Sequence, residues 1–377
     1  MTNELGDLVA LARRSVDVIT SFQDVGGAYP ASPTFPVYQF SWFRDGAFIA
    51  DAMSRVGAQR SADAFFDWCT RVLHGRRDQV LDLITRKGTS IDRDEFLPTR
   101  YTLGGSDTGE QWWNFQIDGY GTWMWALIQH TTRHAISLKP YREAIELSVQ
   151  YLCAFWSVPC FDWWEEHPDE VHPSTIAAVS AGLRAAMSSG VLDAPLESQC
   201  NTVCAEIDLV LRTDAVVDGH LTKSVGRTDI DASLISCFTP FETLDPGSDL
   251  SASTYARIAQ ELAPDGVHRY LADTFFGGGR WVVLAGLVGW HEARIGNIQE
   301  ASRRLRWMHD QATREGFLPE QVLTHALHPD RVDEWVQRWG PVATPLLWSH
   351  AMYLTLGCEL GLWGTELSPD TTTRRSL

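Results

Sequence analysis

The amino-acid sequence predicts an all-α protein in which two concentric rings of helices form an (α/α)6 barrel. Most of the chain shows apolar residues at helical spacing. The helices also come in pairs, because a strongly apolar helix is followed by a more amphipathic one, as at residues 46–57 and 60–74. A helix that is apolar on every side has to be buried on every side. Six such helices, each shielded by an outer partner, give the double ring.

Helical periodicity extends along the sequence from its N-terminal region to residue 361. The predicted segments are residues 4–20, 46–74, 120–136, 140–156, 174–188, 195–212, 251–262, 281–295, 298–314 and 343–361. The apolar members of the pairs begin near residues 46, 120, 174, 231, 281 and 343, at intervals of roughly 50 to 75 residues. Strand signals are sparse, and residues 215–224, with Asp218-Gly219 at their centre, predict one short β-hairpin.

The organisation of the chain predicts one domain. Its 377 residues contain no stretch of proline, serine and glycine that indicates a linker. We therefore expect a single barrel domain over residues 1–366 and a disordered tail over residues 367–377. Seven scattered cysteines without a Cys-x-x-Cys pair predict free thiols, and the acidic start of the chain does not fit a secretion signal. Together these features predict a cytoplasmic protein.

Charge and composition narrow the choice of ligand. A formal net charge of −17 disfavours binding to nucleic acids and to anionic membrane surfaces, and no apolar run is long enough to span a membrane. The chain has 16 tryptophans, several of them next to charged residues. Indole rings that stack on sugar faces, beside charged groups that bind hydroxyls, are typical of carbohydrate sites. We expect a sugar-binding cleft, with large aromatic residues filling the core as the alternative.

Charged and aromatic residues stand directly before the apolar helices. Trp42-Phe43-Arg44-Asp45 precedes the helix near 46, and Asp162-Trp163-Trp164-Glu165-Glu166 precedes the helix near 174. Because these loops open on the same end of the ring, they predict a funnel on a rigid scaffold. Two further residues each fit two roles. Asp118 fits a substrate contact or a helix cap, and Trp112 fits a residue that stacks on a sugar or a residue of the core.

Two carboxyl groups on opposite sides of a sugar carbon are needed to hydrolyse a glycosidic bond. Glu165, Glu166 and Glu320 are the best candidates. Apolar and acidic neighbours favour the protonated form of Glu165, which suits a general acid. Glu320 follows Pro319 in a funnel loop and suits a general base, although each carboxylate also fits a solvated surface group. His172, His325, His328 and His350 lack the spacing of metal ligands, so we expect no metal and no cofactor.

Several blocks resemble glycoside hydrolase family 15, the glucoamylase and glucodextranase family, and they occur in its order between Tyr38 and Ala351. The blocks are Trp42–Asp45, Asp162–Glu166, His268–Asp273, Gly278–Trp281, Gly316–Gln321 and Pro345–Ala351. Trp163 departs from the leucine that the family has there, which changes the wall beyond the cleaved bond. The resemblance implies an (α/α)6 barrel, inversion at the anomeric carbon, attack from the non-reducing end and no cofactor.

The resemblance also implies roles for individual residues. Glu165 is implied as general acid and Glu320 as general base, with Tyr38 placing the water. The implied substrate contacts include Arg44 and Asp45 on the terminal glucose and Glu166 on the next sugar. The full set expected to bind substrate is Tyr38, Trp42, Arg44, Asp45, Trp112, Asp118, Trp164, Glu166, Arg269, Trp281 and Trp348.

Compact members of this family act on isomaltose, and the resemblance favours an α-1,6-linked substrate of this kind. An α-1,4-specific glucoamylase and a trehalase remain as alternatives. A sugar epimerase or isomerase is another, because such barrels also carry that chemistry, which uses histidines such as His350. The last alternative is a barrel that binds sugars without catalysing a reaction. The sequence does not indicate the oligomeric state.

Overall fold

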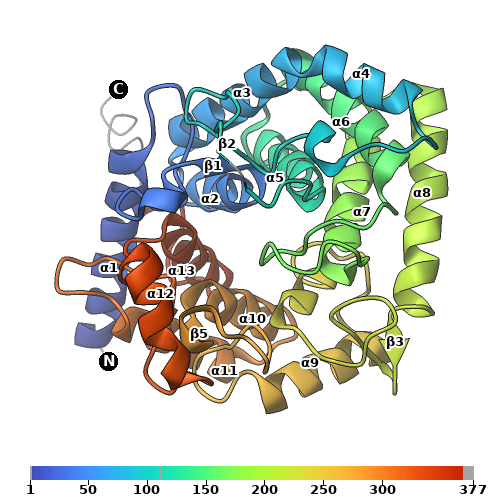
Figure 1. Cartoon of the computed structure of the whole chain (residues 1–377). Coiled ribbons are helices and arrows are strands. Elements are labelled where there is room, and N and C mark those ends of the chain that lie inside the picture. Colours follow the sequence, from blue (N-terminus) through green and yellow to red (C-terminus); the bar gives the residue numbers. More distant parts are fainter. Residues whose placement is uncertain (1, 111, 368–377) are drawn as a thin grey trace, which may run out of the picture.

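The computed structural model describes residues 2–110 and 112–367, and these residues form a double ring (Figure 1). The inner ring consists, within the described residues, of α2 (Phe43–Arg55), α5 (Asp118–His134), α7 (Pro173–Ser188), η4 (Ala232–Cys237), α10 (Val282–Arg294) and α13 (Leu347–Glu359). Each of these segments contacts the next in this order, and α13 contacts α2, so the ring closes.

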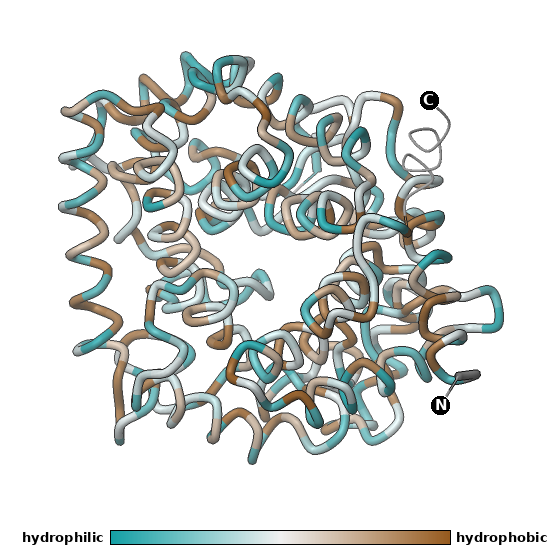
Figure 2. The backbone as a smooth tube through the Cα atoms, turned by 180° about the vertical axis from the view of Figure 1, so that it is seen from behind, coloured by the Kyte–Doolittle hydropathy of each residue, from teal (hydrophilic) through white to brown (hydrophobic). Residues whose placement is uncertain are grey.

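An outer helix packs against each inner segment. These outer helices are α3 (Gln59–Gly75), α6 (Arg142–Phe155), α8 (Ala194–Arg212), α9 (Asp249–Glu261), α11 (Ile298–Asp310) and α1 (Thr2–Phe22), which covers α13. Viewed from behind, hydrophilic and hydrophobic positions alternate along α8, as expected for a helix with one face in solvent (Figure 2). The all-α barrel predicted from paired helices is therefore confirmed, and the predicted and observed helix limits differ by a few residues.

The fourth inner segment corrects the prediction of an apolar helix beginning near residue 231. Only a short 3-10 helix, η4, forms there, and irregular chain continues to α9. Pro240 lacks a backbone N–H and disfavours helical geometry at Thr239, so a helix cannot propagate past this point. The peptide bond between Thr239 and Pro240 is cis. Pro345 acts similarly at α13, which begins at Leu347 and not near residue 343.

The remaining elements lie in the connections. They are α4 (Arg77–Thr85), α12 (Val332–Trp339), the 3-10 helices η1 (Pro36–Tyr38), η2 (Arg93–Glu95), η3 (Lys139–Tyr141), η5 (Phe275–Gly277), η6 (Pro329–Arg331) and η7 (Thr365–Leu367), and the strands β1 (Ser41–Trp42), β2 (Arg100–Tyr101), β3 (Val216–Val217), β4 (His220–Leu221), β5 (Arg280–Trp281) and β6 (Gln321–Val322). Each strand pairs antiparallel, β1 with β2, β3 with β4 and β5 with β6. The predicted hairpin is β3–β4, and its turn has left-handed Asp218 and Gly219.

The prediction missed α4 and α12. Both are short helices on the outside of the rings, and α12 follows Pro329 in a polar stretch. Their apolar residues are too few to set up the long periodicity by which the ring helices were recognised. The site described below shows that α12 matters for the pocket.

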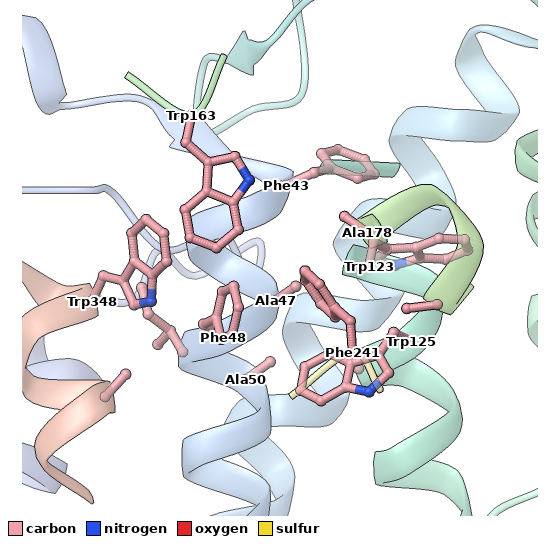
Figure 3. Close-up of a cluster of buried hydrophobic side chains, with 14 of the residues drawn as sticks. Phe43, Ala47, Phe48, Ala50, Trp123, Trp125, Trp163, Ala178, Phe241 and Trp348 are labelled. Carbon is pink, nitrogen blue, oxygen red and sulfur yellow. The ribbon is translucent and has the colours of Figure 1, made fainter. Parts of the chain in front are cut away.

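Most of the hydrophobic core is one cluster that extends from Leu8 on α1 to Leu367, and a small second cluster contains Phe35, Phe276 and Ala343. At the centre of the ring, aromatic side chains from several segments meet, including Phe48 on α2, Trp348 on α13 and Trp163 (Figure 3). The rings of Phe48 and Trp348 stack with centroids 5.1 Å apart. These aromatic residues form a rigid floor beneath one end of the barrel.

The core supports the single-domain prediction, which we retain as a proposal for residues 1–366. Most of the predicted tail, residues 368–377, lies outside the described residues. Among the described residues, no helix combines the length and apolar character that crossing a membrane requires. The seven cysteines are all described, and each is a free thiol.

Candidate active site

A pocket of about 300 Å³ opens at one end of the barrel, where the loops before the inner helices converge. Every predicted site residue except Asp118 lines it. These lining residues are Tyr38, Trp42, Arg44, Asp45, Trp112, Trp164, Glu165, Glu166, Arg269, Trp281, Glu320 and Trp348. The size falls at the lower end of the range for small-molecule sites. The structure thus brings together residues that are up to several hundred positions apart in the sequence.

Asp118 lies behind the pocket wall and holds Arg44. The Arg44 guanidinium donates hydrogen bonds to Gln116 Oε1 at 2.7 Å and to Asp118 Oδ2 at 3.1 Å. Asp118 is the first residue of α5, and the cap residue before it makes no side-chain capping bond. Neither role considered for Asp118, direct substrate contact or helix cap, is therefore what the structure shows. Its carboxylate fixes the arginine that faces the pocket.

Several polar atoms in the pocket are buried and have no hydrogen-bond partner within the described residues. They include the indole nitrogens of Trp163, Trp281 and Trp348, and also Arg44 Nε and Asp45 Oδ2, which lie 3.4 Å apart as an ion pair. A buried polar group without a partner costs about 1–3 kcal/mol. Because these atoms gather around one cavity, they form a set of donors and acceptors that suits the hydroxyl groups of a sugar. Carbohydrate is the ligand class this pocket fits.

Glu165 stands on a loop of unusual backbone geometry. Its φ angle is 64°, in the left-handed region that non-glycine residues rarely adopt. The Trp42 indole donates a hydrogen bond of 2.8 Å to Glu165 Oε1. Burial raises the pKa of Glu165 above its ordinary value, and it outweighs the opposing effects of the Trp42 bond and of Arg44. A proton on Glu165 is thereby favoured, as the sequence predicted.

Glu320 stands in a regular backbone setting. Its N–H donates to the carbonyl of Ala343 at 2.9 Å, and its carbonyl accepts from Val282 N–H at 3.2 Å, beside β6. The residue is 2% exposed. Burial raises the pKa of Glu320 to about 7, although a hydrogen bond with Tyr38 and the charge of Arg269 both lower it. Near neutral pH this carboxyl group is poised to take up a proton.

Arg269 lies under a set of aromatic rings. It makes two hydrogen bonds to Asp273, at 2.7 Å from Nε and 2.5 Å from a terminal nitrogen, and its terminal nitrogen lies 3.5 Å from Glu166 Oε1. Its guanidinium is 5.2 Å from the centroids of both Trp164 and Trp281. The bidentate bond to Asp273 locks the guanidinium in place. Arg269 therefore offers a fixed positive charge between the two carboxyl groups of Glu166 and Glu320.

The sequence analysis missed part of the pocket wall. The missed lining residues include Trp113, Thr274, Phe275, Trp335 and Trp339. Trp335 on α12 donates a hydrogen bond of 2.8 Å to the carbonyl of Thr274, and the rings of Trp339 and Trp113 lie 6.4 Å apart. The signal was the pair Trp335 and Trp339, four residues apart on one helical face. Helix α12 therefore closes one side of the pocket mouth.

One group of potential metal ligands occurs among the described residues. Asp162, Glu166 and His167 have ligand atoms within 4.8 Å of one another. However, the ammonium group of Lys223 lies 3.2 Å from Asp162 Oδ2, so a cation already balances this charge. The expectation that the protein uses no metal stays a prediction.

Fold and site together point to a class of protein: a helical barrel whose sugar-sized pocket holds the carboxyl groups of Glu165 and Glu320 suits a glycoside hydrolase. The family model described as glycosyl hydrolases family 15 matches residues 8–280, and the chain belongs to this family. An isomaltose glucohydrolase of Kribbella flavida is 48% identical over 366 residues, 96% of this chain and 95% of the relative. A trehalase of Thermoplasma volcanium is 26% identical, over 61% of this chain and 38% of the relative.

Solved structures agree with this assignment. A wild-type glycosidase of 48% identity matches with a TM-score of 0.94, covering 96% of this chain and 99% of its own. A variant of a glycosidase with the same TM-score and 47% identity was solved in complex with glucose. A bacterial glucoamylase complexed with acarbose matches with a TM-score of 0.72 at 17% identity, over 97% of this chain and 57% of its own. This last match bears on the fold alone and supports the helical barrel.

Proposed function

We propose that this glycoside hydrolase is an inverting exo-acting α-glucosidase that releases β-glucose from isomaltose and other short α-1,6-linked glucosides. The observation that carries the proposal is the pairing of the half-buried Glu165 and the buried Glu320, both with raised pKa values, in one pocket whose lining includes polar atoms without hydrogen-bond partners. The 48% identity to the isomaltose glucohydrolase of Kribbella flavida supports the choice of linkage.

In the proposed reaction Arg44 and Asp45 bind hydroxyl groups of the terminal glucose, and Arg269 contacts the same sugar. Glu165 transfers its proton to the glycosidic oxygen as the bond to the anomeric carbon breaks. Glu320 accepts a proton from a water molecule near Tyr38, and that water attacks the opposite face of the sugar. Because water arrives opposite the leaving group, the anomeric configuration inverts. The burial that raises the pKa of Glu165 favours the protonated form that this role needs.

The pocket wall supports a short substrate. Helix α12, through Trp335 and Trp339, stands with Trp113 at the mouth and leaves a cavity of about 300 Å³. Glu166 lies beyond Glu165 and accepts a hydrogen bond from Tyr270, which fixes it where the second sugar is expected. The remaining predicted contacts, Trp42, Trp112, Trp164, Trp281 and Trp348, line the same cavity. We infer that the site holds a disaccharide better than a long chain.

The histidine chemistry of an epimerase finds no support in this pocket. Both ring nitrogens of His350 are engaged away from it, one with Ser15 Oγ at 2.9 Å and the other with the N–H of Leu318 at 3.0 Å. Burial lowers the pKa of His350 to about 3, so the ring is neutral near pH 7 and does not supply the imidazolium that a histidine acid requires. The lining residues include no histidine among those described.

Initial rates of glucose release from isomaltose, maltose, trehalose and panose test the proposal. We expect the highest kcat/KM for isomaltose. A higher value for maltose or for trehalose would overturn the linkage while leaving the reaction class intact. Binding of all four sugars without glucose release would overturn catalysis itself and leave a sugar-binding barrel.

The seven free thiols support a reducing compartment, and we propose a cytoplasmic location on that ground. Small α-glucosides are the partners that the pocket fits.

A further inference from the structure

A buried lysine outside the pocket lining ties three parts of the site together. Lys223 lies just after the β3–β4 hairpin and is 3% exposed. Its ammonium group donates a hydrogen bond of 2.8 Å to Asp231 Oδ2 and lies 3.2 Å from Asp162 Oδ2. It also sits 3.6 Å from the centre of the Tyr270 ring. One cation thus joins the chain before η4, the loop that carries Glu165, and the loop that carries Arg269.

The contacts of Asp162 show what this cation holds. Asp162 Oδ1 accepts hydrogen bonds from the backbone N–H groups of Trp164 and Glu166, both at 2.9 Å. The Glu165 N–H donates to the carbonyl of Asp162 at 3.0 Å. Asp162 therefore fixes the backbone on both sides of Glu165, while Lys223 takes its other carboxylate oxygen. The position of the general acid depends on this carboxylate staying charged and in place.

Asp231 extends the same network to the pocket wall. Its Oδ2 atom accepts a hydrogen bond of 2.9 Å from the Trp164 indole, and its Oδ1 atom accepts from the Ser233 N–H at 2.8 Å, which caps η4. Burial raises the pKa of Asp231, but the charge and hydrogen bond of Lys223, together with the hydrogen bonds of Ser233, leave that pKa below its ordinary value. Lys223 thus keeps Asp231 ionised and Trp164 oriented beside Glu165.

The loop needs such support because its backbone is strained. Glu165 and His167 have φ angles of 64° and 50°, although neither is glycine. A residue held in this region costs on the order of 1 kcal/mol or more, and it persists only where the surroundings fix it. The ion pairs of Lys223 with Asp162 and Asp231 stabilise the loop in this conformation. Without them, the loop is expected to relax and move the Glu165 carboxyl away from the glycosidic oxygen.

We propose that Lys223 is a positioning residue for general-acid catalysis, acting through Asp162 and Asp231 to hold Glu165 against the leaving oxygen. This inference rests on the proposed role of Glu165. Its chemical consequence is selective, because a good leaving group departs without a proton, whereas the sugar released from isomaltose does not. Loss of Lys223 should therefore harm isomaltose hydrolysis and spare α-glucosyl fluoride.

The test compares kcat for isomaltose and for α-glucosyl fluoride in Lys223→Met, Lys223→Arg and Glu165→Gln. We expect Lys223→Met to lose about 10- to 100-fold on isomaltose and less than about threefold on the fluoride. Lys223→Arg should recover most of the lost activity. Arg304→Met is the matched control, because it removes another buried cation, paired with Glu292 at 3.4 Å, and should lower stability without changing the ratio of the two rates.

The possible outcomes distinguish the role of Lys223 from the role of Glu165. Equal losses on both substrates in Lys223→Met, with selective loss in Glu165→Gln, would overturn the role of Lys223 alone. No selective loss in Glu165→Gln would overturn the assignment of the general acid. If Lys223→Met does not fold, Asp231→Asn replaces it, since this change weakens the same network without leaving an unpaired charge. A ratio of the two rates in Asp231→Asn equal to that of the parent would then contradict the proposal.

Discussion

The two carboxyl groups of the site stand in contrasting surroundings. Glu320 extends from backbone that is hydrogen-bonded to Ala343 and Val282, next to a strand pair. Glu165 extends from a loop with left-handed backbone, held by the ion network around Asp162 and Lys223. Burial raises the pKa of both groups. The proposed base, Glu320, is thus placed by ordinary backbone structure, whereas the proposed acid, Glu165, lies on a loop held by buried charges.

The different backbone surroundings of Glu320 and Glu165 correspond to the different positions that a base and an acid must take. A base that activates water needs a fixed position relative to the barrel, and the β5–β6 pair supplies it. An acid must reach the oxygen between two sugars, at the edge of the first binding site, where only a protruding loop can place it. The strain in that loop is a cost of function that the surrounding ion pairs offset.

The largest expected effect comes from removing the base. Glu320→Gln should lower kcat about 10²- to 10⁴-fold, because no other group on this side of the pocket accepts the proton of water. Unlike loss of the acid, this loss should be equally large on isomaltose and on α-glucosyl fluoride. Steady-state kinetics on both substrates measures it, with the exposed Glu315→Gln as control. If Glu320→Gln instead keeps its activity on α-glucosyl fluoride, Glu320 would be the general acid and not the general base.

Ionisation of Glu320 should lower the free energy of unfolding of the protein. The pKa of Glu320 is about 7 in the folded chain, against an ordinary value of 4.5. Between these values the folded protein holds a proton that the unfolded chain has lost, so stability falls as pH rises through this window. Glu320→Gln lacks this titration and should be more stable than the parent at pH 8 by about 3 kcal/mol.

Urea unfolding at pH 4.5 and at pH 8 measures this difference. We expect the two proteins to be nearly equal at the lower pH and to diverge at the higher one. A variant that is less stable than the parent at both pH values would show that the carboxylate is well satisfied in the empty pocket.

Local helical periodicity predicted the barrel, whereas most of the pocket residues were expected from the blocks that resemble glycoside hydrolase family 15. Apolar periodicity marks the ring helices, and the residues directly before them are bound to converge at one end. Sequence reasoning did not find Lys223, because a lysine after a hairpin carries no sign of the carboxylates that surround it in the fold. It missed Trp335 and Trp339 because α12 is only 8 residues long, and it misjudged Asp118 because its partner Arg44 lies 74 positions away.

A smaller effect is expected from the sugar-binding side of the site. Arg44→Lys loses the planar group that bonds to Gln116 and Asp118 and leaves the buried Asp118 carboxylate poorly matched. We expect kcat/KM for isomaltose to fall about 10- to 100-fold, largely through KM. A change in kcat with an unaltered KM would instead show that Arg44 binds the sugar more strongly in the transition state alone.

The smallest effect should come from Tyr38. Its hydrogen bond lowers the pKa of Glu320, so Tyr38→Phe should raise that pKa and move the acidic limb of kcat/KM, which lies near pH 7 in the parent, to higher pH. We expect kcat at the optimum to fall about tenfold, the low end for a group that orients a proton transfer. A pH profile of kcat/KM for both proteins measures the shift, and a limb that moves to lower pH would contradict it.

The anomeric form of the first product tests the central claim most directly. Proton NMR, recorded while isomaltose is hydrolysed and before mutarotation is complete, distinguishes β-glucose from α-glucose, with Glu320→Ala as control. An initial product that is β-glucose, absent in the control, is what water activated by Glu320 opposite Glu165 predicts. Initial release of α-glucose, or full activity in Glu320→Ala, would contradict the assignment of the two carboxyl groups.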